Sequence, residues 1–594
     1  MSFFEQIHLW AMQHSGTLMF GLIWITITIT AAICTAIAVG RVAAPPSEER
    51  ARRPSNLILR RPPVWGQRPV PAVLILLGVF LICYITITLV WEDFAYFDDF
   101  WFTLYTLKGH NLSPPIWRED GRFWPFGLQE FNIVRHFTNG IIGYHLSIIL
   151  QLVTFASLLL LLDDELKIRS RATLLTIALL AASILFSFSE LWDTSERCVM
   201  LFLLCTVLSV KRFEETQSTF WALAAVVSAQ IMLYNKEIAF VLLLGFAVSR
   251  LILRCRKIDG AGWRFDLFWA RDSRLDMCLA SLAVVFLILY FAFVGNANMH
   301  YADTNSQPRA DVVLAYAKMD FLPWLLVTVL LGRIYMILRY RMAPWLLWDA
   351  LAAGGVACFL AYIYLRLFSV YYLAPVDLIA VLYVGRFAVL SWKKMPSWGK
   401  IAAIPLASII ICQVLLVSTL VMVERKNVIQ GTVEIASVVE TQYRRNSGKQ
   451  LRLFFPFTGG YRIMEFGAYL SSRGIAVKGA DDTAPGPNGV VLAKARRARA
   501  TNSAGGPAED GPCVEWRPVW CQVVNGPASG DLVIVLPIDG ASLAETSPYR
   551  NEGVLLLHST PCLPIPQWSH WLSDQVHFWN GPNRWMDGSV TLWK

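Results

Sequence analysis

Long apolar runs recur along this chain from residue 17 to residue 422, and they limit what it can fold into. A helix needs roughly 20 apolar residues to cross the hydrocarbon core of a bilayer, and fewer if its ends snorkel. By that measure the sequence predicts spans at 17–40, 72–91, 141–162, 172–189, 193–210, 219–234, 238–253, 276–294, 321–338, 345–367, 372–391 and 401–422. The expected fold is therefore a polytopic α-helical membrane protein with about 12 transmembrane helices.

The charge content supports this expectation. Only 16% of the residues are charged, whereas a soluble chain carries about a quarter. The net charge of +9 comes mostly from Arg and Lys in the loops between the apolar runs. Membrane topology explains that excess better than nucleic-acid binding does, so the lipid bilayer is an expected partner and nucleic acid is not.

The loop bases also predict an orientation, because Arg and Lys concentrate in the short cytoplasmic loops. Alternate loops are rich in bases, including Arg52, Arg53, Lys167, Arg169, Lys211, Arg212, Arg254, Arg256, Arg339, Arg341, Lys393 and Lys394. If those loops are cytoplasmic, the N-terminus and the tail after residue 423 are extracytoplasmic. The predicted location is thus a multi-pass inner (plasma) membrane protein of the cell envelope, with its tail in the periplasm.

Three regions are expected. Residues 1–71 hold an extra N-terminal transmembrane helix and an Arg/Pro-rich cytoplasmic linker, and residues 72–422 form the main transmembrane domain. Residues 423–594 are predicted to be a small extracytoplasmic soluble α/β domain. In it, strands are expected at 451–455, 474–478, 531–536 and 553–557, with a helix at 461–473 and a loop or disordered insert at 480–512.

An acidic and aromatic stretch follows the second predicted span. It runs from Trp91 to Trp101 and carries Glu92, Asp93, Asp98 and Asp99. Carboxylates this close raise each other's pKa, which favours a proton acceptor. The alternative interpretation is a solvated loop whose aromatic residues lie at the membrane interface.

Other charged or aromatic residues fall in loops predicted to lie on the same outward face. They are Arg122, Glu190, Asp193, Glu196, Arg197, Lys236, Glu237, His300, Tyr301, Arg366, Tyr371 and Tyr372. Each has a plain structural interpretation: Glu196 could pair with Arg197, Lys236 and Glu237 could form a polar turn, and Arg366 could snorkel. Taken together, acids and bases from distant loops suit a phosphate-bearing lipid and a hydroxyl acceptor.

The order of these features resembles the GT-C superfamily of membrane glycosyltransferases over about 70–422. The resemblance rests on a spanning helix, an outward loop opening with Phe97-Asp98-Asp99-Phe100, the motif Gly121-Arg-Phe-Trp-Pro-Phe126, and many short-looped spans. The nearest members are those related to O-antigen glucosyltransferases and to mannosyl- and aminoarabinosyl-transferases. They take sugar from a polyprenyl-phosphate carrier.

The resemblance implies that Asp98 or Asp99 is the catalytic general base on the acceptor hydroxyl. It implies inverting transfer of a sugar from a polyprenyl-phosphate donor to a glycan or lipid acceptor. Arg122, Arg197, Lys236 and Arg366 are candidates to stabilise the leaving phosphate. In some members a divalent cation assists; the acids here would permit one, but no metal ligand is assigned.

Two other functions are open from the sequence. One is a transporter or flippase of lipid-linked glycans, and the other is an outward-facing glycan polymerase or ligase. The absence of a Walker loop argues against ATP-driven transport within this chain.

Overall fold

The fold was analysed in a computed structural model. It describes residues 72–89, 106, 109, 111–112, 114, 116–117, 121–138, 140–189, 191, 194–255, 273–294, 308–392, 395–446, 450–458, 460–477, 489–495, 521–537, 552–559 and 588–593. The predicted span at 17–40 and the linker at 41–71 lie outside the described residues.

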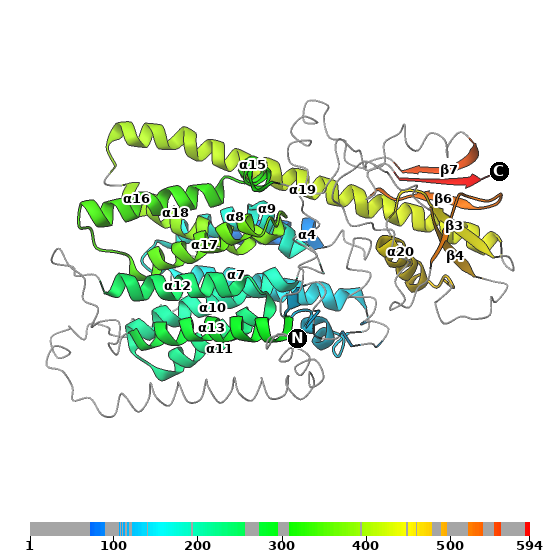
Figure 1. The fold of residues 1–594 in the computed structure, drawn as a ribbon. Helices are drawn as coiled ribbons and strands as arrows, with labels where there is room; N and C mark the ends of the chain where they lie inside the picture. The colour runs from blue at the N-terminus through cyan, green and yellow to red at the C-terminus, as the bar shows by residue number, and fades with distance from the viewer. Residues whose placement is uncertain are drawn as a thin grey trace.

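Helices dominate the chain up to residue 445 and lie roughly side by side (Figure 1). They are α4 (Ala72–Leu89), α7 (Ile141–Leu162), α8 (Ile168–Leu180), α9 (Ala182–Ser189), α10 (Thr194–Thr216), α11 (Thr219–Asn235), α12 (Ala239–Arg254), α13 (Arg274–Val294), α16 (Leu322–Arg339), α17 (Leu346–Tyr364), α18 (Ala374–Trp392) and α19 (Ser397–Arg445). Each predicted span from 72–91 onward coincides with one of these helices or with the α8–α9 pair.

Six of the described helices are long and apolar enough to cross a membrane, and α8 with α9 makes a seventh if the pair is one broken span. The two halves of that pair meet at an angle of 72°. Helices α11, with 17 residues, and α12, with 16, are shorter. The chain is thus a multi-pass helical membrane protein.

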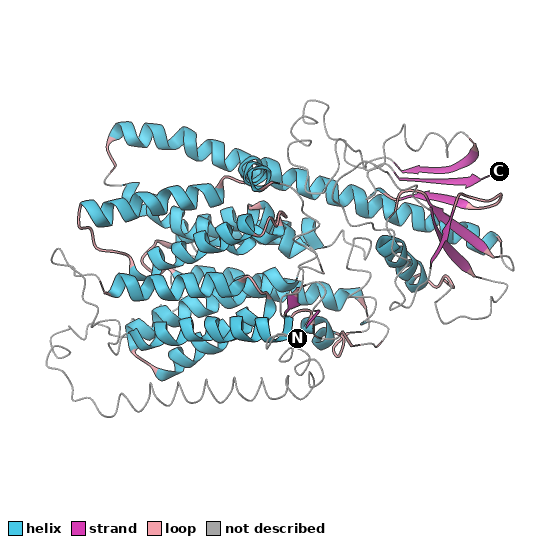
Figure 2. Ribbon diagram, in the orientation of Figure 1, coloured by secondary structure: helices cyan, strands magenta, loops and turns pink. Residues whose placement is uncertain are grey.

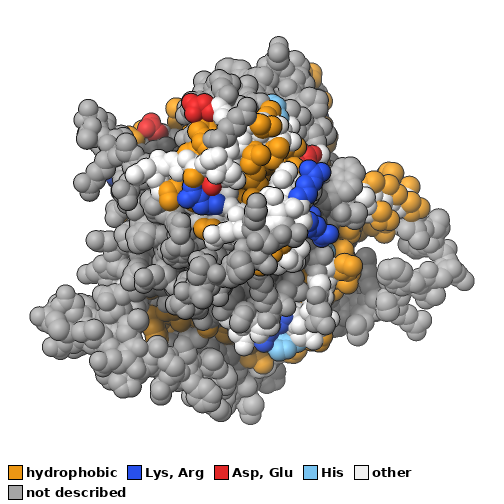
Figure 3. Space-filling model, turned by 90° about the vertical axis from the view of Figure 1, so that its right-hand side faces the viewer, with side chains coloured by type: hydrophobic (Ala, Val, Ile, Leu, Met, Phe, Trp, Pro, Cys, Tyr) orange, Lys and Arg blue, Asp and Glu red, His pale blue; other side chains and the backbone are white. Residues whose placement is uncertain are grey.

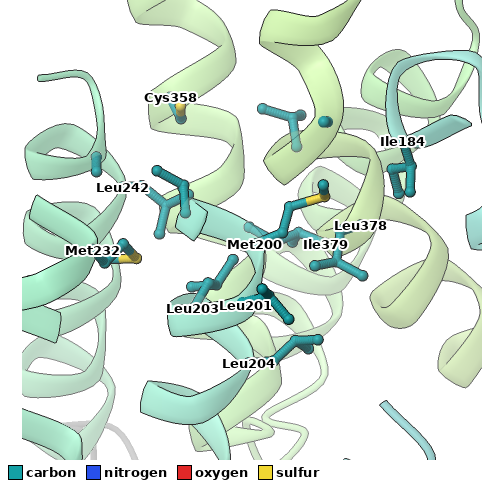
Figure 4. Close-up of a cluster of buried hydrophobic side chains, with 14 of the residues drawn as sticks. Ile184, Met200, Leu201, Leu203, Leu204, Met232, Leu242, Cys358, Leu378 and Ile379 are labelled. Carbon is teal, nitrogen blue, oxygen red and sulfur yellow. The ribbon is translucent and has the colours of Figure 1, made fainter. Parts of the chain in front are cut away.

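Close helix packing holds the bundle together. Between α12 and α17, a Cβ added to Gly354 would lie 2.7 Å from the carbonyl oxygen of Leu242, so the backbones can approach only because that residue is glycine. Apolar side chains from α9, α10, α11, α12, α17 and α18 fill the space between the helices, among them Met200, Met232 and Ile379 (Figure 4). Such interlocked apolar packing fixes the positions of the polar groups at the helix ends.

Because successive helices run in opposite directions, the loops divide between two ends of the bundle. We call them the Lys236 end, where α11 ends and α10, α12 and α18 begin, and the Arg250 end, where α12 and α16 end and α13 and α17 begin. Short elements cover the Lys236 end: the hairpin β1 (Ile116–Trp117) and β2 (Arg122–Phe123), α6 (Gln129–Val134), α15 (Arg309–Met319) and the 3-10 turn η3 (Tyr371–Leu373).

The C-terminal region forms a mixed sheet beyond the Lys236 end (Figure 2). Its order is β5-β4-β3-β6-β8-β7. The strands are β3 (Leu451–Phe455), β4 (Val490–Ala495), β5 (Cys521–Val524), β6 (Leu532–Val535), β7 (Gly553–Ser559) and β8 (Gly588–Trp593), and the helix is α20 (Gly460–Ser472). Strands β3, β4, β5 and β6 are parallel, whereas β8 is antiparallel to β6 and β7.

Two sequence expectations for this region were wrong. The segment expected as a strand at 474–478 contributes one isolated parallel bridge, from Val477 to Val490. The strand that pairs with β3 after α20 is β4, which lies inside the stretch predicted to be loop or disordered. Burial explains the outcome, because Val490, Leu492 and Ala493 are fully buried and a central parallel strand needs apolar residues on both faces.

Helix α19 connects the bundle to the sheet. It is 49 residues long and runs continuously from the Arg250 end into the C-terminal region (Figure 1). There the Ser559 hydroxyl on β7 donates a hydrogen bond to Glu434 on α19, at 2.6 Å. Arg473, just after α20, forms a 3.0 Å ion pair with Glu440 of α19.

Candidate functional site

Eight of the predicted site residues lie in the described part of the chain, and six do not. Asp98, Asp99, Glu190, Asp193, His300 and Tyr301 are outside the described residues. Arg122, Glu196, Arg197, Lys236, Glu237, Arg366, Tyr371 and Tyr372 are described, and all lie at the Lys236 end. The site is therefore described from these eight and their neighbours.

The motif Gly121-Arg-Phe-Trp-Pro-Phe126 anchors the first loop to the bundle. Gly121 has a φ of +68°, a conformation that favours glycine, and its carbonyl accepts a 3.2 Å hydrogen bond from the Tyr290 hydroxyl. Phe123 is fully buried beside Phe286 and Phe293 of α13. These contacts fix Arg122 and Trp124, which flank Phe123, over the turn between α11 and α12.

Lys236 and Glu196 form a buried ion pair at that turn. The Lys236 ammonium lies 2.7 Å from Glu196 Oε1, and the two side chains are 7% and 3% exposed. Glu196 is in the first turn of α10, while Lys236 follows the last residue of α11. The sequence placed both at the site but offered Arg197 as the partner of Glu196, which the structure does not bear out.

Aromatic rings enclose the same ammonium. Lys236 Nζ is 4.7 Å from the ring centre of Trp124, 5.0 Å from Tyr372 and 5.9 Å from Tyr371. Burial is the largest single effect and lowers the pKa of Lys236, but Glu196, Tyr372 and Glu237 together raise it further, so the pKa lies above its usual value. Lys236 therefore stays charged, and its charge is balanced inside the protein.

A second, looser pair lies next to the first. The Arg122 guanidinium is 4.0 Å from Glu237 Oε2, and its carbon is 4.7 Å from the Trp124 ring centre. Glu237 Oε1 accepts a 3.0 Å hydrogen bond from the backbone N–H of Phe123. The ring of Trp124 thus contacts two cations, Arg122 and Lys236. Their side chains are 13% and 7% exposed, respectively.

Arg197 belongs to a different cluster. It is fully buried and donates hydrogen bonds to the carbonyls of Ser187 (2.6 Å) and Leu191 (3.0 Å). It also pairs with Glu130 of α6 at 3.2 Å and contacts Gln151. These bonds hold α6, α7 and α9 together, which makes Arg197 a structural residue of the site's wall.

Arg366 lies at the end of α17, with a φ of +56° and a half-buried side chain. In the described part of the chain no ion pair is found for its guanidinium. Arg309 of α15 is nearby: its guanidinium lies 5.0 Å from the ring of Tyr364 and donates to the Tyr364 carbonyl. Two arginines, Arg309 of α15 and Arg366, thus lie near the end of α17.

A third feature of this end is a pair of buried carboxyls, which the sequence did not predict to meet. Asp320 precedes α16, and Asp377 lies in the first turn of α18, where its Oδ2 accepts a hydrogen bond from Ser183 of α9. Burial raises the pKa of Asp320 to about 6, despite hydrogen bonds from Asp377 and from the backbone of Leu322. The available signal was an Asp just before Phe-Leu-Pro, a pattern typical of helix starts, which favours a cap rather than a partner acid.

The described residues offer no group of three or more His, Cys, Asp or Glu that could hold a metal ion. Glu196 and Glu237 are engaged by Lys236, by Arg122 and by the Phe123 N–H. Asp98 and Asp99, whose carboxylates the sequence would offer to a divalent cation, lie outside the described part.

On the face that carries the C-terminal region, described Lys and Arg side chains lie among hydrophobic ones (Figure 3).

Comparison of this chain with protein-family models, with curated proteins and with solved structures found no match.

Proposed function

We propose that this protein transfers a sugar, with inversion, from a polyprenyl-phosphate carrier to a hydroxyl of a glycan or lipid acceptor. The observation that carries the proposal is the convergence at the Lys236 end. Arg122, Glu196, Lys236, Glu237 and Tyr372 come from four separate segments and meet at the Lys236 end of the bundle. The sequence predicts that Asp98 and Asp99 lie in a loop on the same side of the membrane. The resemblance to GT-C glycosyltransferases assigns the reaction.

The contacts divide the roles among these residues. In the proposal, Asp98 or Asp99 removes the proton of the acceptor hydroxyl as that oxygen attacks the anomeric carbon. The bond from that carbon to the carrier phosphate breaks, and the lipid phosphate leaves with the electron pair. Arg122 and Arg366 stabilise the phosphate, because a guanidinium can form a bidentate pair with phosphate oxygens and both side chains lie at the Lys236 end.

Lys236 takes a positioning role instead of a direct contact with phosphate. Its ammonium is already bonded to Glu196 and enclosed by Trp124 and Tyr372. It holds Trp124 under Arg122, and so fixes the direction of the guanidinium. Because the ammonium of Lys236 is already neutralised by Glu196, it adds little to phosphate binding. The guanidinium of Arg122, which lies over the Trp124 ring, can still form a bidentate pair with a phosphate.

Topology completes the proposal. If the chain has about 12 spans, the positions of the basic loops predict that the Arg250 end is cytoplasmic and that the Lys236 end, with the C-terminal sheet, is periplasmic. A cysteine in place of exposed Glu552, before β7, should then react with a membrane-impermeant maleimide in intact cells. Arg339→Cys at the Arg250 end should react only after the membrane is opened, and the reverse pattern would invert the orientation.

The reaction is tested by replacing the loop acids in a cell that lacks the native gene. Deletion should remove a sugar from an envelope glycan or lipid, as measured by mass spectrometry. Wild type and Asp311→Asn, a control at an exposed position of α15, should restore it, whereas Asp98→Asn with Asp99→Asn should not. Full restoration by the double variant, at equal protein level, would remove the general base from the proposal.

A second candidate is a transporter or flippase of lipid-linked glycans. The observation that favours it is the 72° bend between α8 and α9, because transporters commonly bind substrates at discontinuous helices. Flipping of a fluorescent polyprenyl-phosphate lipid by the purified protein in liposomes, with no sugar transferred, would favour this candidate. Sugar transfer without flipping would favour the first.

A further inference from the structure

Two aspartates from different helices meet inside the bundle. Asp320 joins α15 to α16, and Asp377 is in the first turn of α18; they are 5% and 0% exposed. Asp320 Oδ1 accepts a 2.8 Å hydrogen bond from the Leu322 N–H, and Asp377 Oδ2 accepts one from Ser183. The two carboxyl groups lie within hydrogen-bonding range of each other.

A hydrogen bond between two carboxyl groups requires a proton. An ionised carboxylate only accepts hydrogen bonds, so two ionised carboxylates cannot share one. Asp377 Oδ1 is fully buried and finds no other donor within the described residues. One acid must therefore donate to the other.

Among the described residues, no positive charge takes the place of that proton. The pair is approached by Ser183 of α9, by Tyr316 of α15 and by the backbone of Leu322. In the described part of the chain, no Lys, Arg or His forms an ion pair or hydrogen bond with either acid. Buried acids elsewhere in the bundle are different: Asp276 bonds to two arginines, and Asp349 to Arg333.

We propose that Asp320 and Asp377 form a proton-binding site that holds one proton between them at neutral pH. A buried pair of acids in hydrogen-bond contact cannot both ionise without strong repulsion, so release of the proton would separate them. The described ligand set is two carboxyls and one hydroxyl that already donates, which suits a proton better than a metal ion. This inference does not depend on the proposed sugar transfer.

The site lies where its charge can act on the fold. Ser183 is the second residue of α9, directly after the α8–α9 bend, so its hydrogen bond ties the bend to Asp377. Helix α19 contacts both sides of the site: Ser418 donates to the carbonyl of Leu180 at the bend, and Gln413 to the carbonyl of Met319 beside Asp320. Proton release would therefore disturb the bend and its contact with α19 together.

Infrared spectroscopy of the full-length protein in lipid nanodiscs tests the proposal. At pH 7, wild-type protein labelled with ¹³C-aspartate should show the C=O band of a protonated, hydrogen-bonded carboxylic acid, shifted by the label and by D₂O. Asp377→Asn should lose the band, whereas Asp320→Asn should shift its frequency, because Asp377 stays buried and protonated but no longer has a carboxyl partner. Asp311→Asn should retain it, because that residue is exposed on α15.

Three results would overturn the proposal. They are no such aspartate band in wild type at pH 7, a band that survives in both variants, and a band that appears only when Na⁺ is removed, which would indicate a sodium site. If neither Asn variant accumulates, the labelled wild-type protein alone is the test: the aspartic-acid band supports the proposal, and its absence overturns it. Because sugar transfer is not measured, failure here would leave the proposed function standing.

Discussion

The two ends of the helical bundle handle buried charge in opposite ways. At the Arg250 end, Arg250 and Arg254 each bond to both Glu214 and Asp276, at 2.6–2.7 Å. Nearby, Asp349 accepts hydrogen bonds from Arg333 and from the Tyr383 hydroxyl, and Arg386 pairs with Asp163 and Glu165. Nearly every acid there meets an arginine directly.

At the Lys236 end the charges are less completely matched. Lys236 has one close carboxylate and is otherwise enclosed by rings. Arg122 lies 4.0 Å from Glu237, and among the described residues Asp320 and Asp377 contact each other and neutral donors. The difference teaches that arginine–carboxylate networks lock the helices at one end, whereas the buried charges at the other end are held by fewer close ionic contacts between described residues.

The largest effect on stability is expected at the Arg250 end. Asp276→Asn leaves two arginines with one acid in a buried setting, and breaking such a network costs about 3–5 kcal/mol. The thermal midpoint in detergent should fall by several degrees or more. Arg339→Ala, at an exposed position of the same end, is the matched control and should change it little. Equal midpoints for the two variants would show that the network does not lock the helices.

A pH-dependent effect of nearly this size is expected from Asp320. Its folded pKa is about 6, above the usual 3.8, so the folded state holds a proton that the unfolded chain has lost. The free energy of unfolding should therefore fall as the pH rises from about 4 to about 6, by about 3 kcal/mol at most, and then level off. Asp320→Asn should flatten this slope in melting curves across that range, while Asp311→Asn should preserve it.

A smaller loss is expected for Glu196→Gln. It removes the negative partner of the buried ion pair, at a cost of about 1.5–3 kcal/mol, because lysine can shed its proton where arginine cannot. The pKa of Lys236 is raised in the folded wild type. Its contribution is therefore complete below about pH 10.4 and lost as the pH rises through the folded pKa. In the variant, burial lowers the pKa of Lys236 with less opposition, so the alkaline fall of the thermal midpoint should shrink or reverse. Identical alkaline curves would mean that the pair is not formed.

The smallest stability change, and the sharpest test of the comparison, is Arg122→Gln. The partner Glu237 is 4.0 Å away and retains the Phe123 N–H, so the free energy of unfolding should change by less than about 1 kcal/mol. If Arg122 holds the carrier phosphate, restoration of the envelope sugar should nevertheless be lost. Arg135→Gln, at another arginine of the first loop, should leave that restoration intact. A variant with full transfer would remove Arg122 from the site.

Helix positions followed from the sequence because runs such as 276–294 are apolar over their whole length, and α13 covers that run. The bend at Ala181 could not be predicted, since Ala-Ala-Ser contains neither proline nor glycine. It is stabilised from a distance, by Ser418 on α19 and by the bond from Ser183 to Asp377. Propensity is a weak guide when partners far along the chain decide the geometry.

The candidate site, like the fold, could be predicted only in part. The sequence predicted that Lys236, Glu196, Glu237 and Arg122 lie at one end of the bundle, because alternate loops of a membrane protein lie on the same side of the membrane. It could not tell that Glu196 pairs with Lys236 while Arg197 turns to Glu130, since adjacent residues on a helix point in different directions. The partner of Asp320 was equally hidden, because Asp377 approaches it from another helix.

Helix α19 has one further consequence. Its 49 residues at about 1.5 Å each make a rod of roughly 70 Å, while the hydrocarbon layer is about 30 Å thick. More than half of the rod must project into water, and the sheet is bonded to that part through Glu434 and Glu440. The long helix thus sets the distance between the sheet and the lipid headgroups, so any molecule that the sheet binds is held at that distance from the membrane.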